Sequence, residues 1–336
     1  MDAKDILLHT LSHPASADGF VSGQELADRC GVSRTSVWKY VEVLRRQGAL
    51  IEAVTNRGYR LAGGNLFTKD SIALLLPKDS GVRIHFFPEI DSTNTEAKRR
   101  LSDCAPEALH KAVFVAAAQT AGRGRMGRAF HSPEGGGVYL SIVYASAPIT
   151  QPARLTATAA VGVCRALQAV YSANAKIKWV NDVFVNGKKV CGILTEGTPN
   201  FETGRIDAAV IGIGVNIVWN SGGSPELSKT AGGVIEGSHE NKRSELCAAI
   251  ISEVLAILDG GEAQMAAAME EYRRRALLTG SRVEAFPVIG SRKESYFCTV
   301  LDVTDDAKLR VRTDSGEIRI LESGEVSLHS DRIQSS

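Results

Sequence analysis

Residues 175–194, AKIKWVNDVFVNGKKVCGIL, decide how the middle of the chain folds. Two apolar runs flank Asn186-Gly187, and Asn-Gly is the dipeptide that favours a type I′ turn between antiparallel strands. The stretch therefore predicts a β-hairpin with strands at 183–185 and 188–194.

Further strands and helices alternate on both sides of this hairpin. Because some of the strands arrive as hairpins, we expect a mixed sheet with helices on one side rather than a doubly wound parallel sheet. The predicted strands span residues 83–87, 112–118, 138–144, 175–180 and 206–217. The predicted helices span residues 91–101, 154–171, 241–259 and 261–275.

The last part of the chain carries short apolar runs separated by glycine and aspartate. This pattern is typical of a small antiparallel barrel of SH3-like size. The predicted strands lie at 281–286, 294–303, 309–313 and 318–321.

The first part of the chain has the pattern of a helix-turn-helix. Ser22 to Glu25 reads S-x-x-E, a capping box that satisfies two free amides at a helix start. Gly31 suits a left-handed helix end, and Ser33 caps the next helix after a short turn. That second helix has an apolar stripe at i, i+4 and i+7, formed by Val37, Val41 and Leu44.

The opposite face of this second helix is polar and basic, and it carries Arg34, Thr35, Ser36 and Lys39. Such groups suit contacts with phosphates and base edges in the major groove of DNA. Residues 50–61 predict a β-hairpin wing with Arg57 near its tip. A small helical adaptor with solvated charges is the alternative interpretation.

These patterns together predict an α+β chain of three domains. We expect a winged helix-turn-helix over residues 1–63, a linker over 64–79, a mixed-sheet α/β domain over 80–275 and an SH3-like barrel over 276–330. A chain of 336 residues has room for two or three domains of ordinary size.

Composition limits the class of protein. The net charge of +1 does not by itself indicate a nucleic-acid-binding protein, so DNA binding would need a local basic surface. The six cysteines are scattered without CxxC spacing, which argues against a disulfide framework or a zinc site and favours the cytoplasm. A signal peptide and an apolar run of about 20 residues are both lacking, so we expect no membrane association.

Residues 119–128, QTAGRGRMGR, alternate glycine with arginine. Glycines let a backbone approach a ligand closely, and arginines offer fixed donor pairs to carboxylate or phosphate. We expect such a loop to be mobile alone and to order around an anion. Nonspecific nucleic-acid binding and a solvated turn remain alternatives, and the loop lacks the G-K-[ST] ending of a Walker loop.

Two more clusters carry polar groups on strands. The hairpin brings Lys189 back towards Asp182, and one lysine with one carboxylate at a strand end can hold phosphate and magnesium. A surface ion pair worth only ~0–1 kcal/mol is the alternative. In the run from Gly212 to Asn216, small residues permit close approach and the asparagine can bind a base, although plain strand packing also explains one G-x-G.

The ordered set of motifs resembles the biotin protein ligase family, in the form that is both ligase and repressor. The resemblance covers nearly the whole chain, because the helix-turn-helix and the terminal barrel flank the motifs as they do in that form. The matching motifs are DSTN at 91–94, Gln119 with GRGRMGR at 122–128, KWVND at 178–182, KKVCGIL at 188–194 and GIGVNI at 212–217.

The resemblance implies a class II synthetase-like ligase domain and a role for each motif. The residues implied to bind biotin are Ser92, Thr93, Asn94, Gln119, Gly122, Arg123, Gly124, Arg125 and Lys189. Those implied to bind ATP are Arg125, Arg128, Phe130, Lys178, Trp179, Asn181 and Asn216. Asp182 is implied to hold Mg²⁺, and the catalytic residues are implied to be Lys189, Arg125 and Arg123.

Three positions depart from the commoner family pattern. Met126 replaces a frequent arginine, Val180 a frequent proline and Phe130 a frequent tryptophan. None of them removes a charge that the reaction needs, and Phe130 still offers a ring for adenine.

The implied activity is formation of biotinyl-5′-AMP from biotin and ATP, then transfer of biotin to a lysine of the biotin carboxyl carrier protein domain of a carboxylase. The implied regulation is repression at operator DNA by a homodimer loaded with the adenylate, which acts as co-repressor. The alternatives are a lipoate-type ligase, a metabolite-sensing repressor without catalysis, and a ligase whose N-terminal domain no longer binds DNA.

Overall fold

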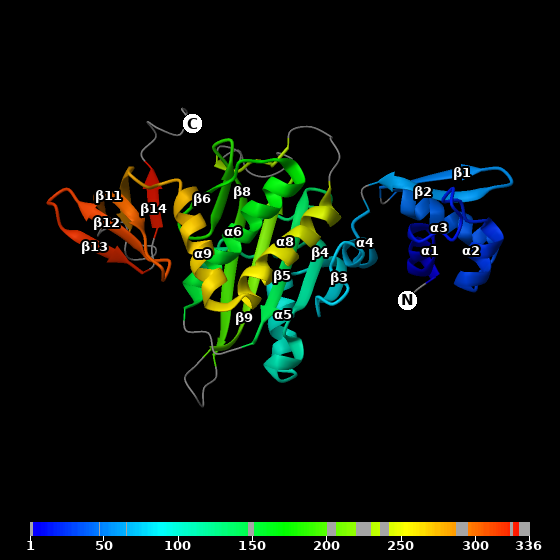
Figure 1. The fold of residues 1–336 in the computed structure, drawn as a ribbon, viewed down its shortest axis with the longest axis horizontal. Coiled ribbons are helices and arrows are strands. Elements are labelled where there is room, and N and C mark those ends of the chain that lie inside the picture. The colour runs from blue at the N-terminus through cyan, green and yellow to red at the C-terminus, as the bar shows by residue number, and fades with distance from the viewer. Residues whose placement is uncertain are drawn as a thin grey trace. The chain divides into compact units, whose positions relative to one another are not determined.

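The computed structural model describes residues 3–46, 48–64, 66–146, 151–199, 206–219, 230–235, 242–286, 295–322 and 325–328. The chain divides into two compact units, whose elements are labelled in Figure 1. The first comprises Met1–Pro77 with Ser238–Ala248, and the second comprises Lys78–Gly237 with Ala249–Ser336.

The first unit contains the predicted helix-turn-helix and wing. Its elements are α1 (Ala3–Ser12), α2 (Gly23–Cys30), α3 (Arg34–Arg46), β1 (Ala49–Val54), β2 (Gly58–Gly64) and α4 (Lys69–Ala73). β1 and β2 pair antiparallel. Residues 66–77, predicted as part of a bridge, include α4 and belong to this unit.

The predicted caps and helix end of α2 and α3 are present in the structure, with one exception. Ser22 Oγ accepts a hydrogen bond from the Glu25 amide at 3.1 Å, and Gly31 ends α2 at φ 64°. Ser33 Oγ accepts from the Ser36 amide at 3.1 Å. The Glu25 carboxylate pairs with Arg29 at 2.8 Å, so the structure shows only the serine half of the expected capping box.

The apolar stripe of α3 forms the centre of the small core of this unit. Val37, Val41 and Leu44 are fully buried, together with Leu7 of α1 and Leu26 of α2. Burial of each such side chain contributes about 1.5–3 kcal/mol. The stripe therefore fixes which face of α3 remains exposed.

The second unit is built on a seven-stranded sheet with strand order β3-β4-β5-β9-β8-β7-β6. β3 and β4 are parallel and the other neighbours are antiparallel, so the predicted mixed sheet is confirmed. The strands are β3 (Arg83–Ile90), β4 (Ala112–Gln119), β5 (Gly137–Tyr144), β6 (Lys176–Lys178), β7 (Asp182–Val185), β8 (Lys188–Pro199) and β9 (Ile206–Asn216).

The hairpin between β7 and β8 turns at Asn186-Gly187, as predicted. Both residues have positive φ, 49° and 73°, which a type I′ turn requires. The turn sets the register that pairs Phe184 with Lys189, and an irregularity between Val183 and Phe184 then shifts the register so that Asp182 pairs with Gly192.

Helices lie on both faces of the sheet, so the expectation of helices on one side is wrong. Thr195 of β8 bonds to Thr156 of α6 (Pro152–Tyr171), whereas the next residue, Glu196, bonds to Asn94 of α5 (Thr93–Ser102). Successive strand residues point to opposite faces. Apart from these bonds to β8, α5 packs mainly against β4, β5 and β9, and the strand pattern did not indicate this second helical layer.

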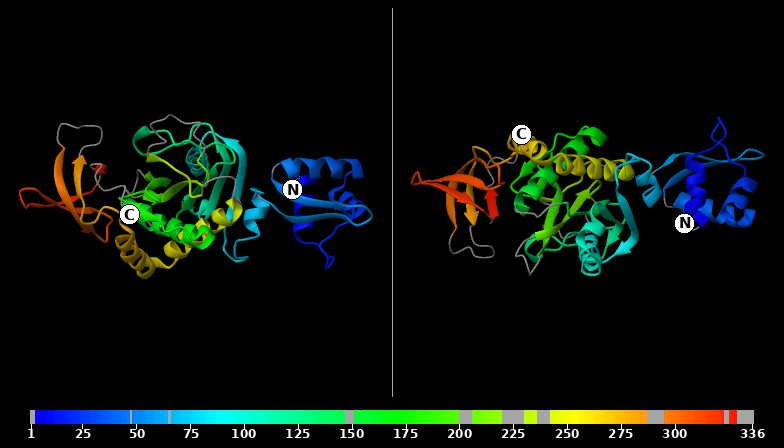
Figure 2. Two further views of the ribbon diagram at one scale, coloured as in Figure 1. Left: turned by 90° about the horizontal axis from the view of Figure 1, so that it is seen from above. Right: turned by 60° about the horizontal axis from the view of Figure 1, so that its bottom comes forward.

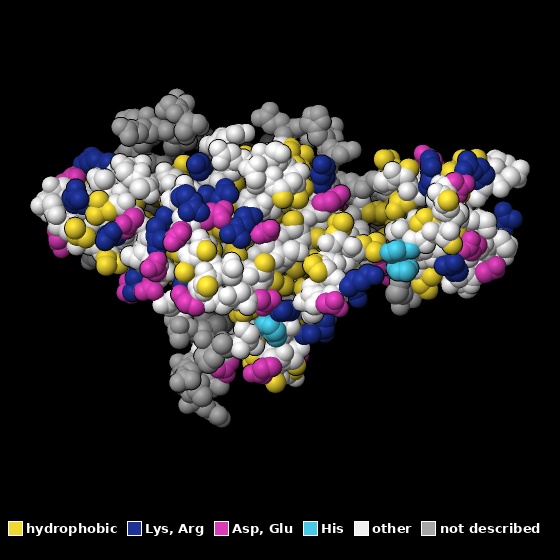
Figure 3. All heavy atoms as spheres, viewed as in Figure 1, with side chains coloured by type: hydrophobic (Ala, Val, Ile, Leu, Met, Phe, Trp, Pro, Cys, Tyr) yellow, Lys and Arg dark blue, Asp and Glu magenta, His cyan; other side chains and the backbone are white. Residues whose placement is uncertain are grey.

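α6 shares its face of the sheet with α8 (Arg243–Asp259) and α9 (Gly261–Arg275) (Figures 1 and 2). A Cβ on Gly162 would lie 2.8 Å from Val254, which shows how closely α6 approaches α8. On the outer surface, Glu271 pairs with Arg165 and Arg275, and basic side chains lie among acidic ones (Figure 3). The positive and negative side chains on this surface therefore balance one another.

The C-terminal strands form a five-stranded antiparallel sheet with order β13-β12-β11-β10-β14. They are β10 (Arg282–Phe286), β11 (Tyr296–Val303), β12 (Leu309–Thr313), β13 (Ile318–Leu321) and β14 (Glu325–Leu328). The fifth strand, β14, was not predicted.

None of the helices in the described ranges has the length and apolarity to span a bilayer.

Leu44→Ala should destabilise the first unit by about 2–5 kcal/mol, because it leaves a cavity at a fully buried site. Amide hydrogen exchange across residues 34–46 of the full chain measures this loss of local stability. Leu50→Ala is the matched control, since Leu50 is 63% exposed. Equal protection in the two variants would contradict the assigned core.

Candidate functional site

The first turn of α5 and the end of β4 share a chain of polar groups. The Thr93 amide and hydroxyl donate to Gln119 Oε1 at 2.9 and 3.2 Å, and Gln119 Nε2 lies 2.8 Å from Ser132 Oγ. Ser141 Oγ lies 2.7 Å from Thr93 Oγ1. Ser92 is the N-cap of α5 and is buried. These contacts orient a set of neutral donors and acceptors on one face of the sheet.

Asn94 is held inside the protein rather than presented to solvent. Its Nδ2 donates to Leu194 O at 3.2 Å and to Glu196 Oε2 at 2.8 Å, and Ser141 Oγ lies 2.6 Å from its Oδ1. A Cβ on Gly212 would lie 2.2 Å from that same oxygen, so only glycine leaves room for it. Asn94 therefore fastens α5 to the sheet.

Glu196 collects positive charge beside Asn94. Lys98 Nζ lies 2.6 Å from its Oε1, and Arg123 Nη1 lies 3.7 Å away. Burial raises the pKa of Glu196, but the hydrogen bonds from Lys98 and Asn94, together with the charges of Lys98 and Arg123, outweigh burial, so the net pKa is lowered. The carboxylate is thus ionised and holds one of the loop arginines.

Ser141 and Glu196 were not predicted as site residues. The available signal was a polar residue in an apolar strand, since Ser141 interrupts the run from Val138 to Tyr144 and Glu196 follows GILT in β8. Their partners are 47 and 102 residues away along the chain, at Asn94 in both cases. Sequence spacing does not indicate such contacts.

The glycine–arginine loop folds back on itself. The Phe130 amide donates to Gly122 O at 2.9 Å, and the Gly124 amide donates to Arg128 O at 2.8 Å. A Cβ on Gly122 would lie 2.3 Å from Phe130 O, so this close return requires glycine. Met126 takes a left-handed φ of 61° inside the short 3₁₀ turn η2 (Arg125–Gly127).

The loop meets the turn before β7 through one arginine. Arg125 Nη1 donates to Asn181 Oδ1 at 3.0 Å, and Asn181 Nδ2 donates to Ile193 O at 3.1 Å. The loop, the turn and β8 are therefore joined at Asn181.

The predicted approach of Lys189 to Asp182 is confirmed. Lys189 Nζ lies 2.7 Å from Asp182 Oδ1. That oxygen is buried and makes no well-directed hydrogen bond, so the contact is an ion pair without hydrogen-bond geometry. The carboxylate keeps lone pairs for another donor or a cation.

The Phe130 ring lies against two glycines of the sheet. A Cβ on Gly214 would lie 2.5 Å from Phe130 Cε1, and one on Gly192 would lie 3.2 Å from Cε2. The small residues of β8 and β9 therefore leave room for this ring. Asn216 lies at the end of β9, where it is buried and pairs with Gly137 of β5.

Trp179 has a different environment from the other predicted nucleotide contacts. Its side chain is 7% exposed, and its indole N–H donates to Ala307 O in the C-terminal strands at 2.8 Å. The donor that a ligand could use is therefore engaged. The contacts predicted with ATP at Lys178, Arg128 and Trp179 stay predictions.

A hollow of about 230 Å³ opens beside Arg125. It is lined by Arg125, Pro152, Ala153, Thr156, Trp179, Val180, Ile193, Leu194, Thr195 and Glu322. Thr156 and Thr195 belong to the α6 face of the sheet, whereas Thr93 and Gln119 belong to the α5 face. Arg125 and Trp179 are the predicted site residues that line this hollow.

The first unit presents the polar face of α3. Arg34, Thr35 and Lys39 are exposed, and Ser36 is half-buried with its hydroxyl 3.0 Å from Ser33 Oγ. Trp38, which was not predicted, is 54% exposed on the same helix. A large aromatic residue outside the apolar stripe was the available signal.

Arg57 of the wing is engaged within the unit. It pairs with Asp18 at 2.6 Å, and its guanidinium lies 4.1 Å from the centre of the Phe20 ring. The hydrogen bond from Arg57 to Asp18 is the main reason why the pKa of Asp18 falls to about 2. For Arg57 to contact DNA, its guanidinium would have to be shared between the DNA and the Asp18 carboxylate.

Two family descriptions match parts of the chain. Residues 86–216 match the biotin/lipoate A/B protein ligase family, and residues 15–60 match an HTH domain. The matched ranges contain the polar site on the sheet and the α2–α3 pair.

Known proteins match over more of the chain. The bifunctional ligase/repressor BirA of Bacillus subtilis is 32% identical over 320 residues, which are 92% of this chain and 94% of that protein. BirA of Bacillus spizizenii is 39% identical over 225 residues, 66% of this chain and 68% of the relative. The fold resembles that of an Aquifex aeolicus biotin protein ligase in complex with biotin and ATP, at TM-score 0.60 and 23% identity over 74% of this chain and 98% of that one.

Identity above 30% along nearly the full length of the Bacillus subtilis protein shows that the chain belongs to the family of bifunctional ligase/repressor BirA proteins.

Proposed function

We propose that this protein activates biotin with ATP as biotinyl-5′-AMP and transfers biotin to a lysine of a carboxylase carrier domain. One observation carries the proposal. Neutral hydrogen-bonding groups at Thr93 and Gln119 share a face of the sheet with Arg123, which Glu196 links to Asn94. A ligand with a polar neutral ring at one end and a carboxylate at the other suits such a site.

The first step joins two anions. The carboxylate of biotin attacks the α-phosphorus of ATP, a carboxyl–phosphate bond forms, and pyrophosphate leaves. Mutual repulsion dominates the barrier, so cationic groups fixed beforehand lower it most. Lys189, Arg123 and Arg125 supply those charges, and the folded loop shields the mixed anhydride from water.

Asp182 fits a role in holding Mg²⁺. Its Oδ1 is buried and lacks a well-directed hydrogen-bond partner, and Asn181 beside it offers an amide oxygen. Magnesium needs only one or two carboxylates when phosphates complete its shell. When bound, the ion would supply charge neutralisation at the phosphates.

The second step needs no nucleophile from the ligase. The amine of the acceptor lysine attacks the acyl carbon and loses a proton, an amide bond forms, and AMP leaves with the electron pair of the acyl C–O bond. The deeply buried cysteines agree with this, because burial raises the pKa of Cys164 to about 12 and keeps its thiol protonated. Such thiols stay reduced in the cytoplasm, where we place the protein.

The N-terminal domain would act as a repressor at operator DNA. The exposed Arg34, Thr35 and Lys39 lie on one face of α3, the helix that enters the major groove in this class of domain. Binding of the adenylate would favour a homodimer through the central sheet, and two such domains would then match a palindromic operator.

Lys189→Gln should slow biotin-dependent exchange of pyrophosphate into ATP by about 100-fold, because it removes a charge fixed where the anions meet. Lys188→Gln is the control, since Lys188 is the exposed neighbour on the same strand. Biotin, and not lipoate, should support exchange in the parent. An unchanged rate in Lys189→Gln, or exchange with lipoate alone, would contradict the proposal.

Lys39→Ala should weaken binding to an operator selected from random-sequence DNA and reduce the salt dependence of the affinity by about one unit of slope. Mobility shifts at several salt concentrations measure both quantities. The exposed Lys69 on α4 gives a matched control as Lys69→Ala. If both variants keep the parent slope, α3 does not contact phosphate through Lys39.

A further inference from the structure

The turn that precedes β7 is held from three directions. Trp179 Nε1 donates to Ala307 O at 2.8 Å, and Tyr272 Oη of α9 donates to Val180 O at 3.3 Å. The Asn181 carbonyl accepts from the Ile193 amide at 3.0 Å. Among these three bonds, the one from Trp179 connects the turn to the C-terminal strands.

The carbonyl that receives the indole belongs to a rigid turn between β11 and β12. The Ala307 amide donates to Thr304 O at 2.9 Å, and the Lys308 amide donates to Thr304 Oγ1 at 3.1 Å. Ala307 is fully buried and has φ 60°, a left-handed conformation that L side chains seldom adopt. The surrounding bonds must therefore enforce the direction of this carbonyl.

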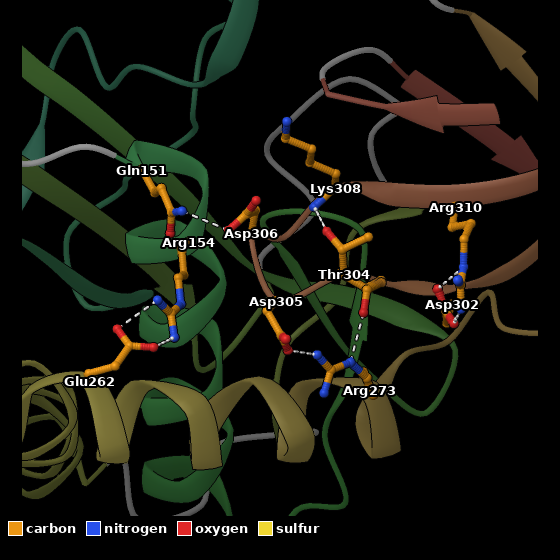
Figure 4. Close-up of polar contacts among 11 residues, drawn as sticks. Gln151, Arg154, Glu262, Arg273, Asp302, Thr304, Asp305, Asp306, Lys308 and Arg310 are labelled. Carbon is orange, nitrogen blue, oxygen red and sulfur yellow. Dashed lines mark hydrogen bonds and ion pairs between the residues drawn. The ribbon is translucent and has the colours of Figure 1, made fainter.

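The same turn is attached to two helices of the central domain (Figure 4). Gln151, the N-cap of α6, donates from Nε2 to Asp306 Oδ1 at 2.7 Å. Arg273 of α9 donates from Nε to Val303 O at 2.7 Å and also pairs with Asp305. The Ala307 carbonyl is consequently fixed relative to the helices that support the sheet.

The two helices are tied to each other beside this turn. Arg154 of α6 is 8% exposed and forms two hydrogen bonds, 2.9 and 2.6 Å long, with Glu262 of α9 (Figure 4). The turn, α6 and α9 thus form one frame. Trp179 connects that frame to Asn181, whose Oδ1 accepts from the loop arginine Arg125.

We propose that Trp179 is a positioning residue of the adenylation step, through which the C-terminal strands set the place of Asn181 and Arg125. The proposal rests on the proposed function, and it assigns Trp179 no contact with the nucleotide. The connection runs from Ala307 O to the indole, along the backbone to Asn181, and from its amide oxygen to the guanidinium. Loss of the indole bond lets the turn shift and moves Arg125 away from the anions.

Trp179→Phe tests this connection, because it keeps a buried ring and removes only the N–H donor. The rate constant of biotin-dependent pyrophosphate exchange should fall about tenfold, since small displacements of a catalytic group cost that much or more. The affinity for biotin alone, measured by calorimetry, should fall by less than the exchange rate does, because Thr93 and Gln119 are held by other elements.

A double-mutant cycle distinguishes positioning from general destabilisation. In an Arg125→Ala background, Trp179→Phe should reduce the exchange rate by less than about twofold, because its effect passes through the missing arginine. If the two substitutions acted independently, their fold losses in exchange rate would multiply. Arg310→Gln is the control, since it breaks an exposed ion pair with Asp302 on the neighbouring strand and leaves the Ala307 turn intact (Figure 4).

Several outcomes would overturn the proposal. These are a parent-like rate in Trp179→Phe, a loss that multiplies fully with Arg125→Ala, or a loss equal to that of Arg310→Gln. Should Trp179→Phe fail to fold, Thr304→Val removes the acceptor of the Lys308 amide and must give a smaller loss that also disappears in the Arg125→Ala background. A parent without biotin-dependent exchange would refute the proposed function and, with it, this proposal. If the parent is active, a failed prediction counts only against the positioning role of Trp179.

Discussion

Cationic side chains that the protein holds with its own acceptor groups are the constraint on which the rest of the site depends. Arg123 and Lys189 each face a carboxylate, at 3.7 Å for Glu196 and 2.7 Å for Asp182. Arg125 instead donates to the neutral amide oxygen of Asn181. Without these partners the cations would repel one another in a partly buried place, where such repulsion is stronger than in water. An anionic ligand can replace these carboxylate and amide oxygens as the partner of each cation.

Absent side chains shape the site as much as present ones do. Glycines at 192, 212 and 214 lie along β8 and β9, where a Cβ would meet the Phe130 ring or the Asn94 amide. The sheet thereby accepts an aromatic ring and a polar helix end on one face, while Thr195 contacts α6 on the other. Catalytic and structural demands are separated by the two-residue period of the strands.

The sequence predicted those parts of the fold that local rules determine. The Asn-Gly hairpin, the cap at Ser33 and the stripe from Val37 to Leu44 depend on neighbours in the chain, and Lys189 meets Asp182 because the hairpin demands it. The position of α5 on the second face, the partners of Glu196 and the bond from Trp179 to Ala307, 128 residues away, depend on tertiary packing instead. No local period encodes such contacts.

The most direct test of the electrostatic account is the single-turnover rate of biotinyl-5′-AMP formation in a variant with Arg123→Gln, Arg125→Gln and Lys189→Gln together. The account predicts a loss of at least about 1,000-fold, with thermal unfolding still cooperative and the uncharged methyl ester of biotin bound as by the parent. Adenylate formation at the parent rate would contradict it, because the three cations would then have no part in bringing the two anions together.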